Sequence, residues 1–492
     1  MGTENHLQLN VIFLPYLTPG HMNPMVDTAR LFAKHGANVT IITTQTNALT
    51  IQKAIDSDFN SGYSIKTYVI QFPSLQLGLP DGVENIKDCT TPQMLEKIFH
   101  GIMMLQPQIE SVFQELQPDC IVSDMFYPWT VESAAKLRIP RLYYYSASSF
   151  SSCVYHFIQK HKPHKGLESD SHKVQIPGLL DKIEIAPTEM DEFQRKENDM
   201  TILMNVVYAS ERRSYGTLCN SFYELEGGYE ELYKNTIGIK SWSVGPVSAW
   251  INKTDEEKAN RGNKVDLKEE PYWLNWLNSK QSDSVLYVSF GSLTRLSYAQ
   301  IVEIAHGLEN SGHNFIWVVR RKGEGDGEGE EECFLQDFEA RMKESDKGCI
   351  IWNWAPQLLI LDHPATGGIV THCGWNSILE SVSSGLPMIT WPLFAEQFYN
   401  EKFLVQVLKI GVSVGAKVNK FWSTVGEDGI VGREELVKAV KTLMGSEESR
   451  EMRKRAKKLG DAAKRTIEEG GTSYNNLMQL MDELKSLKMS RN

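Results

Sequence analysis

The residues of this chain that are best suited to chemistry lie in its second half, directly after an apolar stretch. Residues 368–371 predict a buried strand, and the sequence His-Cys-Gly-Trp-Asn-Ser follows at 372–377, where a helical pattern begins. The first turn of a helix has backbone N–H groups without intrahelical partners, and the helix dipole is positive there, so this end attracts phosphate. We therefore expect this strand–turn–helix to bind a nucleotide diphosphate.

Further polar residues of the second half suit the same ligand. Gly291 and Ser292 follow a predicted strand at 284–290, where glycine permits close approach of the backbone and serine can donate to a phosphate oxygen. Ser377 is followed three residues later by Glu380, which fits a helix capping box. Glu380 could equally accept hydrogen bonds from a ribose, as acidic residues do in nucleotide-binding folds. Both interpretations stay open from the sequence.

The first half offers a candidate general base. His21 lies in a predicted loop, Leu-Thr-Pro-Gly-His, after the first strand, and Asp124 lies just past a short strand at 120–122. In a parallel sheet both loops open on the same edge, so the two side chains can meet. A neutral histidine can take a hydroxyl proton, and a carboxylate behind it fixes the tautomer and stabilises the imidazolium. Taken singly, a loop histidine is commonly a surface residue, and an aspartate at a strand end is commonly a helix cap.

These residues need a scaffold of strands alternating with helices, and the sequence predicts one in each half. In the first half, apolar or β-branched runs predict a helix at 23–34 and strands at 9–14, 37–43, 64–72, 120–122 and 141–145. In the second half, they predict a helix at 298–311 and strands at 284–290, 315–320, 350–352, 368–371 and 388–391. Such alternation favours parallel sheets covered on both faces, which bind ligands beyond the carboxyl ends of their strands. We predict an α/β protein of two facing, doubly wound, Rossmann-like domains.

Composition marks the division between the halves. Residues 252–270 are rich in Lys, Asp, Glu and Asn and nearly free of apolar side chains, as is typical of a linker. We expect a first domain at 1–250, a linker at 251–270, a nucleotide-binding domain at 271–475, and a helix at 476–492 that packs back on the first domain. A second polar segment, 322–332, predicts a mobile acidic loop.

The composition also excludes several classes of protein. The 492 residues hold 51 Lys and Arg against 62 Asp and Glu, and the net charge of −11 is unfavourable for binding nucleic acid. Seven cysteines without a Cys-x-x-Cys spacing argue against a disulfide framework and a zinc site. Neither a signal peptide nor a membrane-spanning segment is predicted, so we expect a cytoplasmic protein, and we expect a monomer. One Asp-x-Asp occurs at residues 56–58 in a predicted polar loop, and we expect no metal there.

Residues 354–397 carry a resemblance to a known family. They resemble the signature box of the plant family 1 UDP-sugar-dependent glycosyltransferases. The matching residues are Trp354, Ala355, Gln357, His372, Cys373, Gly374, Trp375, Asn376, Ser377, Glu380, Pro387, Trp391, Pro392, Glu396 and Gln397. The similarity extends to the Gly-His turn at 20–21 and to the C-terminal helices, so it spans nearly the whole chain. It implies a GT-B architecture with UDP-sugar bound by residues 271–475 and the acceptor bound by residues 1–250.

The resemblance implies a role for each of these positions. Trp354 would stack on the uracil, although a tryptophan at a strand end is also typical of a core. The backbone of Ala355 would pair with the edge of the base, and Gln357 would lie near the base and ribose. Glu380 would contact the ribose. The diphosphate would be bound by Ser292 and by the turn around Gly374, with His372, Asn376 and Ser377. The sugar hydroxyls would be contacted by Trp375, Glu396 and Gln397. A glutamine at the last position favours UDP-glucose.

His21 and Asp124 would be the catalytic pair, since members of the family use such a pair in these two loops. His21 would deprotonate an acceptor hydroxyl or hold an acceptor carboxylate, and this oxygen would attack the anomeric carbon opposite the UDP. The product would be a β-glycoside formed with inversion, and neither a metal nor another cofactor is needed. The first-half segment 143–156 would supply an apolar acceptor pocket with hydroxyl groups.

The sequence is compatible with more than one class of acceptor. The chain resembles most the plant branch acting on triterpenoids and isoflavonoids, so we predict a triterpenoid or saponin acceptor, with an isoflavonoid or flavonoid as the alternative. A non-catalytic binder of nucleotide sugars is an alternative of another class. A dinucleotide-dependent dehydrogenase would share the fold but needs G-x-G-x-x-G after a strand, and the glycines at 323–329 miss that spacing.

Overall fold

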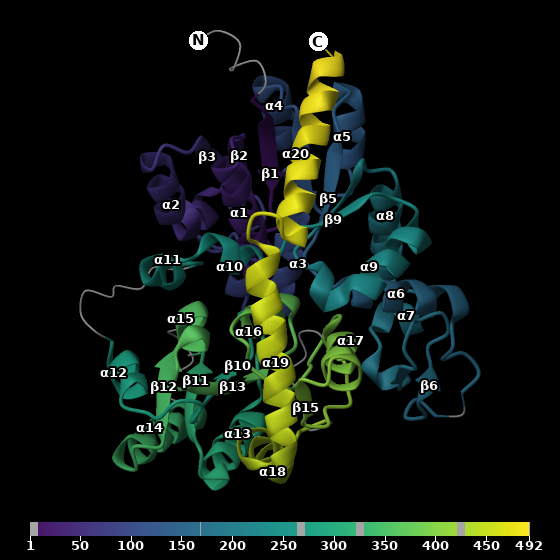
Figure 1. Cartoon of the computed structure of the whole chain (residues 1–492). Coiled ribbons are helices and arrows are strands. Elements are labelled where there is room, and N and C mark those ends of the chain that lie inside the picture. The colour runs from purple at the N-terminus through teal and green to yellow at the C-terminus, as the bar shows by residue number, and fades with distance from the viewer. Residues whose placement is uncertain (1–7, 168, 263–270, 321–328, 421–428, 492) are drawn as a thin grey trace. The chain divides into compact units, whose positions relative to one another are not determined.

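Two parallel sheets organise the chain, and each belongs to a separate unit (Figure 1). The computed structural model describes residues 8–167, 169–262, 271–320, 329–420 and 429–491. Unit 1 comprises Met1–Ser149, Glu197–Lys264 and Lys464–Asn492. Unit 2 comprises Phe150–Lys196 and Val265–Ala463.

The sheet of unit 1 has seven parallel strands in the order β3-β2-β1-β4-β5-β8-β9. Its strands are β1 (Asn10–Leu14), β2 (Asn38–Thr44), β3 (Ile65–Ile70), β4 (Cys120–Asp124), β5 (Arg141–Tyr145), β8 (Gly216–Cys219) and β9 (Ser241–Ser243). From β1 the chain adds strands toward one edge of the sheet (β2, then β3), and from β4 it adds strands toward the other edge (β5, β8 and β9). The carboxyl ends of β1 and β4 therefore form the topological switch point, where open α/β sheets bind ligands.

Helices cover this sheet and close its core. They are α1 (Pro19–Lys34), α2 (Gln45–Asn60), α3 (Pro92–Met104), α4 (Gln106–Leu116), α5 (Thr130–Leu137), α8 (Asp199–Arg212), α9 (Tyr223–Ile237), α10 (Val247–Ile251), α11 (Asp255–Asn260) and α20 (Thr472–Arg491), with the short turn η1 (Ile86–Asp88). In Figure 1 the long yellow helix α20 runs beside β9, in agreement with its contacts. Leu477, Leu480, Met481 and Leu484, at helical spacing, bury one face of α20 in the core of unit 1.

The sheet of unit 2 has six parallel strands in the order β12-β11-β10-β13-β14-β15, so its switch point lies between β10 and β13. The strands are β10 (Val285–Ser289), β11 (Asn314–Val319), β12 (Gly348–Trp352), β13 (Thr366–Thr371), β14 (Met388–Thr390) and β15 (Gly411–Ser413). Nearly every residue of β10 to β14 is buried, as expected for a parallel sheet covered on both faces.

The remaining elements of unit 2 are helices and one small antiparallel ribbon. The ribbon pairs β6 (Val174–Gln175) with β7 (Glu184–Ile185). The helices are α6 (Ser149–His161), η2 (Pro187–Glu189), α7 (Glu192–Arg195), α12 (Tyr272–Asn278), α13 (Tyr298–Ser311), α14 (Glu330–Glu344), α15 (Gln357–Asp362), α16 (Trp375–Ser383), α17 (Gln397–Lys402), the π-helical turn η3 (Phe403–Val407), α18 (Arg433–Gly445) and α19 (Glu447–Thr466). Two of them, α6 and α19, cross the boundary between the units. Each helix in the described part of the chain is too short or too polar to span a membrane.

The strand predictions were confirmed, and three local predictions were wrong. All ten predicted strands occur, with ends within two residues of those expected. His21 lies in the first turn of α1 rather than in a loop, because Pro19 begins the helix early. Ser377 and Glu380 form no capping box, since α16 begins at Trp375 with Gly374 as N-cap.

The Asp-x-Asp at residues 56–58 also lies in a helix, α2, rather than in a loop. Asp58 is buried and accepts hydrogen bonds from the guanidinium of Arg30, and Asp56 accepts from Gln52. Their carboxylates are therefore engaged within unit 1. In the described residues, no three His, Cys, Asp or Glu side chains gather as metal ligands.

The unit boundaries differ from the domain boundaries that we expected. Residues 150–196 belong to unit 2 instead of the first domain, because α6 packs there: the Phe150 ring stacks on Phe403 with centroids 4.8 Å apart. Part of the expected linker, 255–260, is the helix α11 of unit 1, and residues 263–270 lie outside the described residues. Most of the expected acidic loop, 321–328, also lies outside them, while Glu330–Glu332 form the first turn of α14.

Glu211 of α8 generates a prediction on stability. It is buried and accepts a hydrogen bond from Thr217 Oγ1 (3.1 Å), and burial raises its pKa from 4.5 to about 7. Because the folded pKa exceeds the unfolded pKa, this group's contribution to stability is present below pH 4.5 and is lost as the pH rises through 7. Glutamine keeps the acceptor and carries no charge. We expect Glu211→Gln to unfold at a higher temperature than wild type at pH 8, with little difference at pH 5, in thermal unfolding scans.

The exposed Glu469 supplies the matched control, since Glu469→Gln removes a solvated charge from the same unit. Its unfolding temperature should follow wild type at both pH values. A difference between Glu211→Gln and wild type that does not grow with pH would contradict the burial of an ionisable carboxyl at this position.

Candidate active site

The switch point of unit 1 holds the two residues expected to form a catalytic pair. His21 Nδ1–H donates to Asp124 Oδ2 at 2.8 Å. The Asp124 carboxylate is fully buried at the end of β4, whereas the His21 side chain is 23% exposed. A carboxylate on Nδ1 fixes the tautomer in which Nε2 is the basic nitrogen. The contact that the sequence predicted between these two side chains is therefore present.

The surroundings of the pair hold it in this orientation. The backbone N–H of Phe126 donates to Asp124 Oδ1 at 3.0 Å, so each carboxylate oxygen has a defined partner. The rings of Tyr16 and Phe126 lie against the imidazole, with centroids 5.8 and 5.5 Å from it. His21 occupies the third position of α1, so the helix fixes its backbone. The contacts thus hold the imidazole in one orientation beside the buried carboxylate.

Ser146 is a member of this cluster that the sequence analysis did not assign to the pair. Its Oγ lies 3.1 Å from His21 Nδ1. Ser146 directly follows β5, the neighbour of β4, so the rule that joined His21 to Asp124 could have found it. Arg141 lies behind the pair, with Nη2 donating to the backbone oxygen of Asp124 at 3.4 Å.

In unit 2, the turns at the carboxyl ends of four strands each contain a residue with a left-handed backbone. These residues are Gly291 after β10 (φ +75°), Asn353 after β12 (+68°), Cys373 after β13 (+65°) and Ala395 after β14 (+53°). Non-glycine residues rarely adopt this conformation, and such strain clusters at functional sites. The carboxyl edge of the second sheet is where the sequence predicts the ligand.

The imidazole of His372 sits between two glycines at the β10–β13 switch point. A Cβ added to Gly291 would lie 2.7 Å from His372 Cε1 and Nε2, and one added to Gly374 would lie 2.4 Å from Nε2. Glycine is therefore required at both positions for the ring to lie where it does. We call Gly291, His372 and Gly374 the histidine cradle.

Burial lowers the pKa of His372 from 6.5 to about 4, so the ring is neutral at pH 7. Its Nδ1 is buried and has no hydrogen-bond partner within the described chain. Because the folded pKa lies below the unfolded one, the stability that this group contributes is present above pH 6.5 and is lost as the pH falls toward 4. A neutral imidazole can still donate one N–H bond to an anion.

Residues expected around the ribose form a connected group. Gln357 Nε2 donates to Ser377 Oγ (3.1 Å) and to Glu380 Oε2 (2.6 Å), and Tyr287 OH donates to Gln357 Oε1 (3.4 Å). Glu380 is only 3% exposed. Glu380 is therefore held by Gln357, a link that the sequence analysis did not foresee.

The aromatic residues of the expected site differ in accessibility. Trp354 is half-buried, and its Nε1 has no hydrogen-bond partner among the described residues. The neighbouring Ala355 is 7% exposed. Trp375 is only 2% exposed, so its indole is buried, and its backbone begins α16.

Gln397 and Glu396 lie where β14 leads into α17. Gln397 Oε1 accepts hydrogen bonds from the backbone N–H groups of Leu393 (3.0 Å) and Phe394 (3.1 Å), which fixes the orientation of the carboxamide. Its Nε2 group is thereby directed away from these N–H donors. Gln397 is 4% exposed and Glu396 is half-buried. Ser292 and Asn376, also half-buried, belong to the turns after β10 and β13.

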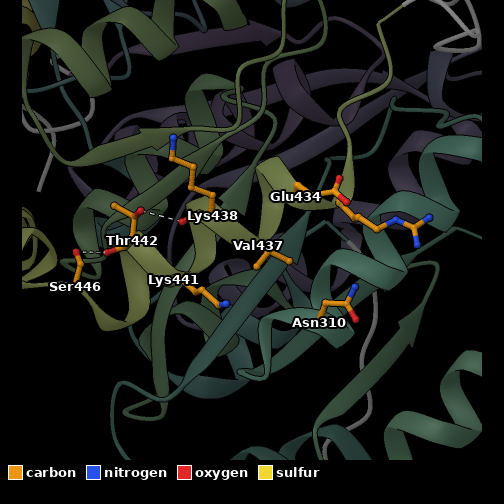
Figure 2. Close-up of a pocket in the computed structure, with 8 residues that line it drawn as sticks. Asn310, Glu434, Val437, Lys438, Lys441, Thr442 and Ser446 are labelled. Carbon is orange, nitrogen blue, oxygen red and sulfur yellow. Dashed lines mark hydrogen bonds between the residues drawn. The ribbon is translucent and has the colours of Figure 1, made fainter.

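A surface hollow of about 610 Å³ lies elsewhere in unit 2 (Figure 2). It is lined by Asn310, Arg433, Glu434, Val437, Lys438, Lys441, Thr442 and Ser446. Asn310 lies in the last turn of α13, and the other lining residues belong to α18 or directly follow it. It is therefore separate from the histidine cradle.

Gly291→Ala tests the histidine cradle. The new Cβ must displace the imidazole or strain a turn at φ +75°. We expect the affinity for UDP, measured by isothermal titration calorimetry, to fall about tenfold, which corresponds to the loss of roughly one hydrogen bond.

Gly445→Ala is the matched control in the same unit, because a Cβ added there meets nothing within 4 Å. Its affinity for UDP should equal that of wild type. An unchanged affinity in Gly291→Ala would contradict the proposed contribution of the cradle to UDP binding.

The chain is similar to known proteins over most of its length. The model of the UDP-glucoronosyl and UDP-glucosyl transferase family matches residues 94–453. The chain is 50% identical over 485 residues to a soyasapogenol B glucuronide galactosyltransferase of Glycine max, covering 98% of this chain and 97% of the relative. It is 43% identical over 491 residues to UDP-glucose flavonoid 3-O-glucosyltransferase 7 of Fragaria ananassa, covering 99% and 98%.

A solved structure is similar over the same extent. UGT73P12 of Glycyrrhiza uralensis, crystallised with glycyrrhetinic acid 3-O-monoglucuronide, is 49% identical, with a TM-score of 0.93 over 98% of this chain and 97% of that one. The predicted GT-B class, with two doubly wound Rossmann-like domains, is confirmed. The chain belongs to the family of UDP-glucuronosyl and UDP-glucosyl transferases, and it is a UDP-glycosyltransferase of the plant family 1 type.

Proposed function

We propose that this enzyme transfers glucose from UDP-glucose to a hydroxyl or carboxyl oxygen of a triterpenoid or triterpenoid glycoside, with inversion. The observation that carries the proposal is the 2.8 Å contact between His21 and the buried carboxylate of Asp124. His21, oriented by this contact, would be the base that a direct displacement at an anomeric carbon requires.

The proposed chemistry proceeds in one displacement. His21 Nε2 takes the proton of the acceptor hydroxyl as its oxygen attacks the anomeric carbon, and the bond from that carbon to the diphosphate oxygen breaks. Asp124 stabilises the imidazolium that forms, and an acceptor carboxylate would need only to be held in place. General-base assistance of this kind is typically worth about 10²–10⁴ in rate. An α-linked donor gives a β-glycoside.

The donor would lie on the carboxyl edge of the second sheet. Trp354 and Ala355 would meet the uracil, and Gln357 and Glu380 the ribose. Neutral His372 would donate from Nε2 to the diphosphate, together with Ser292 and with Asn376 and Ser377 at the start of α16, where the helix dipole favours the developing charge of the leaving group. The backbone of Trp375, Glu396 and the Nε2 group of Gln397 would contact the sugar.

Two relatives support the choice of acceptor. The names of the soyasapogenol B glucuronide enzyme and of the glycyrrhetinic acid 3-O-monoglucuronide complex both concern triterpenoids that already carry a glucuronide. A triterpenoid glucuronide is therefore the first acceptor to test. The flavonoid enzyme of Fragaria ananassa keeps a flavonoid as the second candidate.

An acceptor and donor screen tests the proposal. Each acceptor class is offered with UDP-glucose, UDP-galactose, UDP-xylose and UDP-glucuronate, and products are identified by mass. We expect the largest kcat/KM for a triterpenoid acceptor with UDP-glucose. UDP-galactose as the preferred donor would contradict the assignment from Gln397, and binding of UDP-sugars without product from any acceptor would favour a non-catalytic binder.

His21→Ala tests the base. We expect kcat to fall at least about a hundredfold, since the proton acceptor is lost, while the affinity for UDP stays within about twofold of wild type. The exposed His100, on α3 of the same unit, gives the control His100→Ala, which should retain wild-type turnover. Near-normal turnover of His21→Ala would exclude His21 as the base.

The proposal includes no metal, because the displaced diphosphate would be stabilised by His372, Ser292 and the start of α16. Turnover should therefore be unchanged after dialysis against a chelator, whereas a loss that is restored by a divalent cation would contradict this part of the proposal. We further infer a cytoplasmic monomer, for which the elution volume in size-exclusion chromatography should correspond to about one 55.8 kDa chain.

A further inference from the structure

The loop between β14 and α17, Leu393–Gln397, is held in a strained conformation. Ala395 has a φ of +53°, which a residue with a side chain adopts only when its surroundings impose it. Part of the constraint is internal, since Gln397 accepts the backbone N–H groups of Leu393 and Phe394. The remaining constraints come from outside the loop. We call Leu393–Gln397 the sugar loop, in line with its proposed role.

Asn419 connects the sugar loop to a distant part of the chain. Its Nδ2 donates to the backbone oxygens of Ala395 (3.1 Å) and Glu189 (3.3 Å), and its own backbone N–H donates to Thr188 O (2.8 Å). The backbone N–H of Lys420 donates to Leu393 O at 3.0 Å. One buried carboxamide thus bridges the strained residue of the loop and the turn η2.

Helix α17, which begins at Gln397, is fixed to the same segment by two further side chains. Lys402 Nζ donates to Glu189 Oε1 at 2.8 Å, both side chains being 7% exposed, and it lies 3.8 Å from Glu401. Tyr399 OH accepts a long bond from the N–H of Asp191 (3.5 Å) and donates to Gln194 Oε1. A buried ion pair is weak evidence for stability, and its best-attested use is to specify one arrangement over others.

The edge of the Tyr399 ring packs on Tyr155 of α6, with centroids 5.0 Å apart. Tyr155 and residues 187–194 of unit 2 therefore form a support for the sugar loop and α17. The proposed contacts to uracil, ribose and diphosphate lie on the other turns, after β10, β12 and β13. A change in this support should thus affect the sugar of the donor and leave its UDP portion unaffected.

We propose that Asn419, Lys402 and Tyr399 are positioning residues for the donor sugar. By anchoring the sugar loop and α17 to residues 187–194, they hold Glu396 and Gln397 in the geometry that distinguishes one sugar from another. The inference rests on the proposed function, in which Glu396 and Gln397 contact the sugar hydroxyls. It extends the determinants of sugar choice to residues outside the signature segment.

Asn419→Asp is the main test, because it keeps the shape of the side chain but replaces the group that donates to two carbonyl oxygens and to the Asp191 carboxyl by an acceptor. We expect the KM for UDP-glucose to rise about tenfold and the ratio of kcat/KM between UDP-glucose and UDP-galactose to move toward one. The dissociation constant of UDP, which lacks the sugar, should stay within about twofold of wild type. Tyr399→Phe, which keeps the ring packed on Tyr155, should change the same quantities in the same direction by a smaller factor.

Asn310→Asp is the matched control, since it places the same charge on α13 of the same unit and should leave all three quantities unchanged. The inference is overturned if Asn419→Asp and Tyr399→Phe keep the wild-type KM and sugar ratio. It is also overturned if UDP and UDP-glucose are weakened by the same factor, because that result indicates a general structural role. Failure of the proposed function is a separate result, since the wild-type enzyme would then turn over neither UDP-sugar.

Discussion

The parallel pairing of β1 with β4, and of β10 with β13, is the constraint on which the rest of the structure depends. In the first sheet the register places Leu14 beside Ser123, so the segments that follow bring His21 and Asp124 together across 103 residues of sequence. In the second sheet the register places Ser289 beside Thr371, so Gly291 and His372 meet. At each pair the strand order reverses, and the two following helices leave the edge in opposite directions. The candidate site residues of each unit lie where this reversal separates the following helices.

Preorganisation is the common property of the two clusters. The buried Asp124 has its two oxygens assigned to His21 and to a backbone N–H, and the imidazole of His372 is confined between two glycines. Left-handed backbone at the ends of β10, β12, β13 and β14 requires a well-packed surrounding to persist. Such sites need little rearrangement when a ligand binds, which favours stabilisation of charge that develops during a reaction.

The allocation of residues 150–196 to unit 2 changes how specificity is understood. The sequence suggested that acceptor recognition belongs to the first half and donor recognition to the second. In unit 2, Phe150 of α6 stacks on Phe403 of η3, and Glu189 of η2 pairs with Lys402 of α17. Part of the first half of the chain thereby supports the loop proposed to select the donor sugar.

Much of the fold followed from the sequence by itself. Continuous apolar runs bounded by polar turns identified ten strands, because a strand in a covered parallel sheet must be apolar on both faces. The same runs identified which polar residues follow strands, and therefore His21, Asp124, Ser292 and His372 as candidates at sheet edges. The short strands β8, β9 and β15, of three or four residues, were not predicted.

Only the tertiary structure decided which side chains meet and which are withdrawn. Trp375 and Glu380 belong to the signature segment, yet the indole is buried, and the carboxylate accepts a hydrogen bond from Gln357. The position of Ser146 beside His21, the contact of Gly291 with His372 and the bridge made by Asn419 join residues far apart in the sequence. Local sequence sets propensity and strand ends, whereas strand order, register and packing between distant segments determine contacts, and these depend on the whole chain at once.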